Sequence, residues 1–253
     1  MAVVDTGIDP GISALHGADR AKIVDWVDLT DEGRVDTGLR VRGAGDSITV
    51  AGRAVRLGPT RSVSGEYAVG WWRETWDMDG NGRDRDVFLV VVIDSTRSGV
   101  YDRVVIDTDR DFDLRNNPAV WAYRHLREYV TLGDGARPPR PGVSLVVCHI
   151  SADGSHIKLG FDGHGHGTQM AAIAAAQGGI PGVAPAARLL AIKALTSDGT
   201  GSWADVVVGV EHAILRGAHV VLVSATEVGQ GGPDEEQSRR LQDLAERHGA
   251  VLV

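Results

Sequence analysis

The chain has 253 residues, of which 43% are hydrophobic and 24% are charged, a composition typical of globular proteins rather than of disordered or membrane-embedded chains. Its formal net charge of −8 disfavours nucleic acid or an anionic membrane as a partner, because either would repel an acidic surface. The single cysteine, Cys148, excludes an intrachain disulfide and a cysteine-rich zinc site, and its apolar neighbours favour a small buried residue over a thiol nucleophile.

A short strand-like run ending in an aspartate opens the chain. Residues 2–5 read AVVD and are followed by a Thr-Gly turn, so they predict a strand that presents the Asp5 carboxylate at its end. A turn aspartate that binds its own backbone is the structural alternative. A second D-T-G at Asp36 would suit an aspartic protease, but it lies too near Asp5 in sequence for two separate lobes.

Residues 18–142 predict a mostly β insertion. Five strand-like runs are separated by Gly, Asp and Ser turns, and one helical pattern stands at 117–130. The strand-like runs are residues 22–30, 45–57, 66–72, 86–94 and 101–109.

Residues 143–253 alternate short β-branched runs with longer helical patterns. Helices are predicted at 166–177, 202–217 and 233–249, the last two ending at Gly217 and Gly249, with strands at 187–195, 219–226 and 250–253 and an apolar run at 143–150. This alternation predicts an α/β fold with a parallel sheet, whose core consists of residues 1–17 and 143–253.

Three local patterns could carry chemistry: VVDTGID around Asp5, DGHGHGTQMAAIAA around His166, and the Gly-rich turn SDGTGSWADVV leading into a helix. In this order they resemble the subtilisin-like serine proteases, the subtilases of peptidase family S8. The resemblance implies a three-layer subtilisin-like core, peptide or protein substrates, and an Asp-His-Ser catalytic triad. Asp5 would then be the orienting carboxylate and His166 the general acid/base, since a serine nucleophile needs a base and the base needs an acid to orient it.

Two histidines compete for the catalytic position. In the family pattern, Gly-Thr follows the catalytic histidine directly, and only His166 satisfies this. An H-x-H pair could instead bind a metal, but no Cys or H-E-x-x-H partner accompanies it. His164 is therefore interpreted as a loop residue.

The resemblance also implies substrate contacts. Residues 199–203 match the segment that pairs with an extended substrate as an added strand, with Trp203 lining a pocket; core packing is the alternative for this tryptophan. Ser224, Ala225 and Thr226, at the end of the strand at 219–226, would form a wall of the pocket nearest the cut. The predicted substrate-binding residues are Gly199, Thr200, Gly201, Trp203, Ser224, Ala225, Thr226 and Glu227, with Thr226 in place of the usual glycine.

The long interval between Asp5 and His166 resembles the branch of tripeptidyl peptidase II and its bacterial relatives, as do DTGIDPG and KIVDWVDLTDEG. In that branch two glutamates capture the free amino terminus of the substrate. Glu227 matches one of them, and Trp203 stands at the other position. The resemblance thus leaves open an endopeptidase or a tripeptidyl peptidase, and it is compatible with a homo-oligomeric parent.

No cofactor is expected, and calcium is the weak alternative. Asp77, Asp79, Asn81 and Gly82 fit positions of a calcium loop whose twelfth position holds Phe88 instead of Glu. Asp107, Asp109, Asp111 and Asp113 alternate and would share one face of a strand, although solvated turns are the favoured interpretation.

The 253 residues contain no G-T-S-x-[AS] segment and no A-G-N segment. We therefore expect a fragment of a longer protease, truncated at both ends and inactive by itself. The alternative, from a different functional class, is a catalytically inactive subtilase-like binding module that uses its β insertion to hold a partner. The sequence leaves the compartment open, as the parent could be secreted or cytoplasmic.

Overall fold

The computed structural model describes residues 1–17, 22–43, 45–133, 142–225 and 235–253. The chain forms two compact units, of which the first comprises Met1–Asp31 with Gly160–Val253 and the second comprises Glu32–Leu159. No helix among the described residues has the length and apolar character needed to cross a bilayer.

The first unit is built on a five-stranded parallel sheet with the order β15-β14-β1-β13-β2. Its strands are β1 (Ala2–Asp5), β2 (Ile23–Asp28), β13 (Leu189–Lys193), β14 (Val220–Val223) and β15 (Val251–Leu252). Its helices are the short 3-10 helix η1 (Ser13–Leu15) together with α2 (His166–Ala175), α3 (Trp203–Leu215) and α4 (Glu235–His248). The first strand in sequence, β1, is thus the central strand of the sheet, and its carboxyl end is Asp5.

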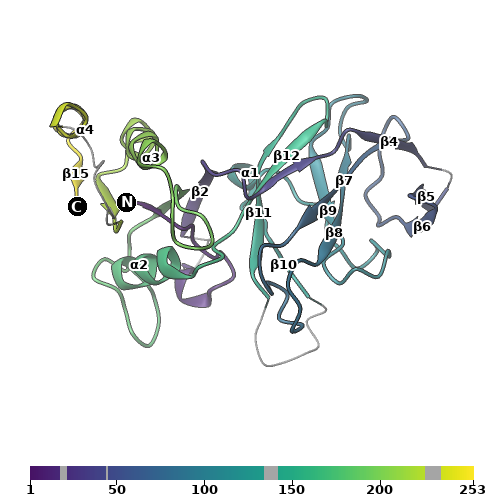
Figure 1. Cartoon of the computed structure of the whole chain (residues 1–253), viewed down its shortest axis with the longest axis horizontal. Coiled ribbons are helices and arrows are strands. Elements are labelled where there is room, and N and C mark those ends of the chain that lie inside the picture. Colours follow the sequence, from purple (N-terminus) through teal and green to yellow (C-terminus); the bar gives the residue numbers. More distant parts are fainter. Residues whose placement is uncertain (18–21, 44, 134–141, 226–234) are drawn as a thin grey trace. The chain divides into compact units, whose positions relative to one another are not determined.

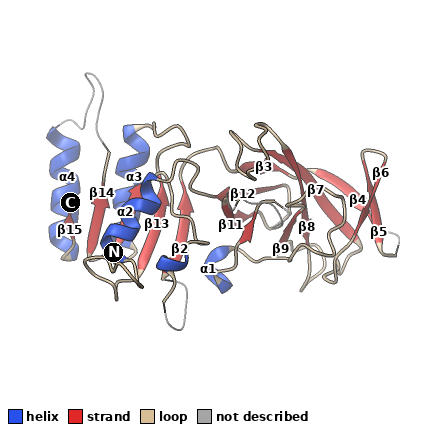
Figure 2. Ribbon diagram, turned by 90° about the horizontal axis from the view of Figure 1, so that it is seen from below, coloured by secondary structure: helices blue, strands red, loops and turns tan. Residues whose placement is uncertain are grey.

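Helices cover both faces of this sheet, so the predicted α/β fold with a three-layer core is confirmed. The side chains of β1 alternate between the faces. Val4 packs into the apolar cluster shared with α3 and α4, whereas Asp5 points to the side of α2. Figures 1 and 2 show α2 and α3 beside the strands of this sheet.

Glycine sets the distance between α3 and the sheet. A Cβ at Gly209 would lie 2.9 Å from Val4 Cγ1 and 3.1 Å from Ile192 Cγ2. Both of these side chains are almost completely buried, and full burial of such an aliphatic side chain contributes about 1.5–3 kcal/mol. The absence of a side chain at position 209 therefore lets the helix pack directly on the central strands.

The second unit is almost entirely antiparallel β structure. A four-stranded sheet has the order β4-β7-β8-β9, a second has the order β10-β11-β12-β3, and β5 and β6 form a hairpin. The strands are β3 (Arg34–Asp36), β4 (Leu39–Arg42), β5 (Ser47–Val50), β6 (Arg53–Arg56), β7 (Glu66–Arg73), β8 (Val87–Ile93), β9 (Arg103–Ile106), β10 (Val130–Thr131), β11 (Ser144–Ile150) and β12 (His156–Gly160).

The helix predicted at 117–130 is mostly wrong, because the structure contains only the single turn α1 (Tyr123–Leu126). Before it, Val120 is held in a β-bridge with Val104. After it, Arg127 adopts the left-handed conformation with φ 59°. Before α1, the pairing of Val120 with β9 thus outweighs the helical pattern of the sequence. After α1, the left-handed conformation of Arg127 ends the helical turn.

The units divide the chain at Asp31 and Gly160, whereas the sequence placed the boundaries after residues 17 and 142. The difference has a structural reason at each end. Strand β2 pairs in parallel with β13, so residues 23–28 belong to the parallel sheet. Strands β11 and β12, by contrast, extend the antiparallel sheet that contains β10 and β3.

We expect Gly209→Ala to destabilise the first unit, although alanine normally favours a helix over glycine by about 1 kcal/mol. The added methyl group overpacks the contact with Val4 and Ile192, which typically costs about 1–3 kcal/mol. Urea denaturation followed by circular dichroism would measure the loss. The control Val208→Ala changes a half-exposed position of the same helix and should leave stability nearly unchanged. A gain in stability in Gly209→Ala would contradict the close contact.

Candidate active site

The structure brings Asp5 and His166 into direct contact across 161 positions of sequence. Asp5 ends the central strand β1 and is fully buried, and His166 is the first residue of α2. The imidazole Nδ1 lies 2.8 Å from Asp5 Oδ1 and 2.9 Å from Oδ2. The site therefore lies where parallel α/β sheets usually place their functional groups, at the carboxyl end of the strands.

The two side chains differ in their access to solvent. Asp5 is completely enclosed, whereas the His166 side chain is 33% exposed. With Nδ1–H donating to the carboxylate, Nε2 is the ring nitrogen that can accept a proton from another group. A buried acid that orients a partly exposed imidazole in this way is the arrangement required for general base catalysis.

A second carboxylate, Asp162, holds the start of α2, and the sequence prediction did not include it. Its Oδ1 accepts hydrogen bonds from Thr6 Oγ1 and from the backbone N–H of Gly165, both at 2.8 Å. Its Oδ2 accepts the backbone N–H of Thr168 at 2.9 Å. Asp162 is the one acid within residues 155–165, directly before the predicted helix. Because acidic residues are favoured at helix N-termini, its position in the sequence could have indicated this role.

Thr6 connects Asp5 with this network. Its backbone N–H donates to Asp5 Oδ1 at 2.6 Å, and its Oγ1 accepts the backbone N–H of Gly167 at 3.0 Å. Thr6, the residue directly after β1, thus binds both the acid and the helix that carries the base.

Gly167 allows α2 to reach the strand. A Cβ at this position would lie 2.1 Å from the carbonyl oxygen of Gly7 and 3.1 Å from Asp5 Cβ. Because the closer neighbour is a backbone atom, a side chain at residue 167 would push His166 away from Asp5.

The predicted substrate segment forms a closed turn between β13 and α3. Thr196 N–H donates to the carbonyl of Thr200 at 2.7 Å, and Gly199 takes the left-handed conformation with φ 80°. The hydrogen bonds from the Thr196 hydroxyl and from the Thr200 N–H and hydroxyl lower the pKa of the Asp198 carboxyl to about 2. At neutral pH this turn is therefore held by an ionised side chain.

His164 lies between this turn and His166. Its Nε2 is 3.1 Å from the point that a Cβ of Gly199 would occupy, and its ring centroid is 6.2 Å from that of His166. The structure thus brings Gly199 and the two histidines together. Within the described ranges, no group of three potential metal-ligating side chains includes His164.

The other predicted substrate residues occupy several environments. Trp203 begins α3 after the capping residue Ser202 and packs against the apolar cluster of the parallel sheet, where its Nε1 is buried without a hydrogen-bond partner. Ser224 and Ala225 follow β14 and are partly buried. Thr226 and Glu227 lie outside the described residues. The assignment of these residues to substrate binding stays a prediction.

Two groups of carboxylates in the second unit could hold a cation: Glu74 with Asp79 and Asp86, and Asp107 with Asp109 and Asp111. The first group contains its own counter-charge, because the Arg110 guanidinium binds Asp79 at 3.2 Å and also binds Asp86. In the predicted calcium loop, Asp77 accepts the N–H of Gly82 at 3.0 Å. Phe88, at the twelfth position, is fully buried in β8. The absence of a cofactor stays a prediction, with calcium at this loop as its alternative.

The alternating aspartates after β9 do not share the face of a strand, because β9 ends at Ile106 and residues 107–113 form a loop. Asp107 is also buried rather than solvated. Its carboxylate accepts the N–H groups of Asp111 and Phe112. Burial and, to a smaller extent, the neighbouring Asp109 raise the pKa of Asp107 to about 6, and the hydrogen bond from Phe112 opposes this rise in part.

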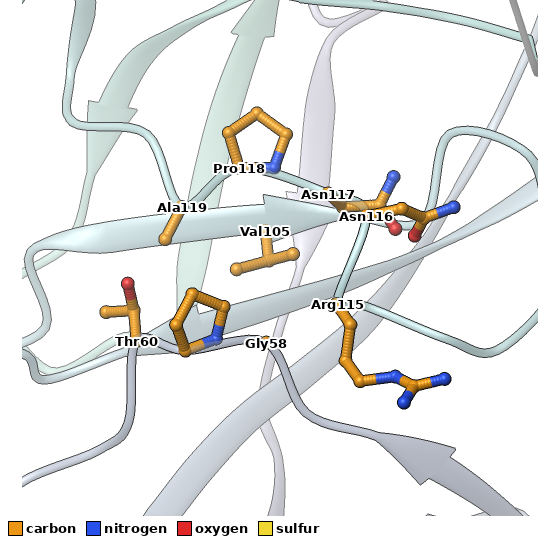
Figure 3. Close-up of a pocket in the computed structure, with 9 residues that line it drawn as sticks. Gly58, Thr60, Val105, Arg115, Asn116, Asn117, Pro118 and Ala119 are labelled. Carbon is orange, nitrogen blue, oxygen red and sulfur yellow. The ribbon is translucent and has the colours of Figure 1, made fainter.

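A hollow of about 280 Å³ lies in the second unit between residues 58–60 and 115–119 (Figure 3). Pro118, Ala119 and Val105 give it an apolar lining, and Arg115 is paired with Asp113. Its lining residues include no acid, histidine or cysteine, so no general base accompanies the hydroxyl of Thr60 in this hollow.

Comparisons with known proteins identify the family to which the chain is similar. The model of a family described as the subtilase family matches residues 1–253. Pyrolysin of Pyrococcus furiosus is 27% identical, with 100% of this chain and 22% of that protein covered. Thermitase of Thermoactinomyces vulgaris is 43% identical over 67 residues, which cover 25% of this chain and 24% of thermitase.

The crystal structure of tripeptidyl peptidase 2 is similar with a TM-score of 0.72 over 100% of this chain and 25% of that chain, at 14% sequence identity. At this identity the likeness shows a shared fold. The chain spans about a fifth of the length of pyrolysin and a quarter of that of the tripeptidyl peptidase 2 chain.

We expect Gly167→Ala to separate His166 from Asp5 because the new methyl group collides with the Gly7 carbonyl. The proton on His166 Nδ1, seen by 15N-resolved NMR of the imidazole, should lose its hydrogen-bonded signal while the circular dichroism of a folded chain is retained. Gly179→Ala is the matched control, since a Cβ there meets nothing within 4 Å. An unchanged Nδ1 signal in Gly167→Ala would show that the contact does not set the position of α2.

We expect the stability of the second unit to fall as the pH rises from about 4 to about 6. The pKa of Asp107 is higher in the folded chain than its ordinary value, so the folded state binds the proton more tightly and loses this advantage once the carboxyl ionises. Between these two pH values, the free energy of unfolding should fall by on the order of 1–3 kcal/mol because of Asp107.

Asp107→Asn should flatten this pH dependence and raise stability at pH 7.5, measured by urea denaturation with tryptophan fluorescence. The exposed Asp84→Asn is the control and should keep the wild-type profile. A wild-type pH profile in Asp107→Asn would exclude Asp107 as its source.

Proposed function

Because the chain belongs to the subtilase family, we propose that Asp5 and His166 are the orienting acid and the general acid/base of a serine peptidase that hydrolyses peptide bonds. The observation that carries the proposal is the pairing of His166 Nδ1 with both oxygens of the buried Asp5 carboxylate. This geometry fixes the Nδ1–H tautomer, which leaves Nε2 to take a proton from a nucleophile.

The chemistry of each residue follows from its environment. In the proposed reaction, His166 Nε2 takes the hydroxyl proton of a serine as that oxygen attacks the substrate carbonyl, and later returns the proton to the leaving amine. Asp5 stays ionised and stabilises the imidazolium that forms in between. The exposed side of His166 faces the solvent from which a substrate arrives, whereas the enclosed side faces the acid.

The serine would come from a G-T-S-x-[AS] segment, and the 253 residues contain none. We therefore propose that this chain supplies the acid and the base of the triad and that a longer protein supplies the nucleophile. By itself the chain should not turn over peptides, because the covalent route lacks its attacking oxygen.

The substrate class follows from the same family membership and is a peptide or protein. Trp203 favours an endopeptidase over a tripeptidyl peptidase. Capture of a free amino terminus would use two carboxylates; Glu227 supplies one, but an indole packed against the core supplies no negative charge. A tripeptidyl peptidase would need a second acid from another position.

The proposal is tested in a longer protein that joins these 253 residues to a segment with the serine. His166→Ala should lower kcat for peptide hydrolysis by a factor on the order of 10⁴ or more, because the serine then has no base. His248→Ala, an exposed position at the end of α4, should retain full activity.

Two results would contradict the proposal. One is full peptidase activity in the His166→Ala variant of the longer protein. The other is cleavage of a peptide library by the purified 253-residue chain that disappears in its own His166→Ala variant, which would show that the chain carries a nucleophile of its own.

A further inference from the structure

A buried lysine lies beside the candidate catalytic acid. Lys193 is the last residue of β13 and has no exposed surface. In the pairing of β13 with β1, its Cα is in register with that of Asp5. The sequence alone gave no reason to separate this lysine from the surrounding apolar run.

The ammonium group joins three segments of the site. Nζ donates to the carbonyl oxygens of Thr6 and Leu195, both at 2.9 Å, and lies 5.2 Å from the centre of the Phe161 ring. Thr6 directly follows the acid, Leu195 leads into the closed turn at 196–200, and Phe161 precedes Asp162 and α2.

Thr6 links these contacts to the acid and the base. Its N–H holds Asp5 Oδ1, and its hydroxyl lies between Asp162 Oδ1 and the N–H of Gly167. Its remaining backbone group, the carbonyl, accepts from Lys193. Thr6 is therefore held at its N–H, its hydroxyl and its carbonyl, on both sides of its Cα.

Packing alone does not explain a lysine at this position. Burying an ammonium is costly unless it is fully hydrogen-bonded, and an apolar residue of similar size often serves a core as well or better. Here the buried cation lies in the same network as two buried carboxylates, Asp5 and Asp162. The ammonium binds Thr6, whose N–H and hydroxyl in turn bind these two carboxylates.

From these contacts we propose that Lys193 is a positioning residue for the Asp5–His166 pair. Its ammonium binds the Thr6 carbonyl and so fixes the position of Thr6. The N–H of Thr6 in turn orients the Asp5 carboxylate toward His166 Nδ1. This inference rests on the proposed function, in which that pair supplies the acid and the base.

The test compares Lys193→Met with Lys22→Met in the 253-residue chain. Lys22 is also buried in the first unit, where its Nζ donates to the Pro185 carbonyl, so both variants lose a buried ammonium and some stability. Only Lys193→Met should lose the hydrogen-bonded Nδ1 proton signal of His166 in 15N-resolved NMR. Lys193→Arg, which keeps the cation, should recover the signal.

If Lys193→Met does not fold by circular dichroism, Lys193→Gln takes its place, because glutamine keeps a donor without the charge. Its His166 Nδ1 proton should exchange with solvent faster than in the wild-type chain, and an equal exchange rate would overturn the proposal. An Nδ1 signal that persists in a folded Lys193→Met variant would overturn it as well. A wild-type chain that lacks this signal would instead refute the proposed function, so the two failures are distinguishable.

Discussion

The enclosed carboxylate of Asp5 is the constraint on which the first unit is built. An ionised acid without solvent must be compensated by hydrogen bonds or by opposite charge. Here the compensation comes from the N–H of Thr6 and from His166. Both belong to segments that must meet at the end of β1, so satisfying the acid also assembles the site.

Close packing on both sides of β1 makes this assembly rigid. On one face Gly209 lets α3 contact Val4, and on the other Gly167 lets α2 contact the turn after Asp5. The two glycines have different local roles, one in the middle of a helix and one at its start. Their shared property is the lack of a side chain where a helix meets the central strand. The position of His166 is thus decided by backbone contact as much as by its hydrogen bond.

Several carboxylates of the second unit are compensated within that unit. Arg110 neutralises Asp79 and Asp86, and backbone N–H groups bind the buried Asp107 carboxylate. These residues all lie within Glu32–Leu159, so their charges are balanced by groups of the same unit.

The sequence by itself determined the alternation of strands and helices, the two glycine stops at Gly217 and Gly249, and the pair Asp5 and His166. Each of these depends on local patterns: hydrophobic periodicity, turn residues and short motifs. Only the tertiary structure decided that residues 23–28 join the parallel sheet, that residues 117–130 contain a single helical turn at Tyr123–Leu126, and that Lys193 binds the segment next to Asp5. The reason is that each of these depends on contacts between residues far apart in sequence, which no local pattern records.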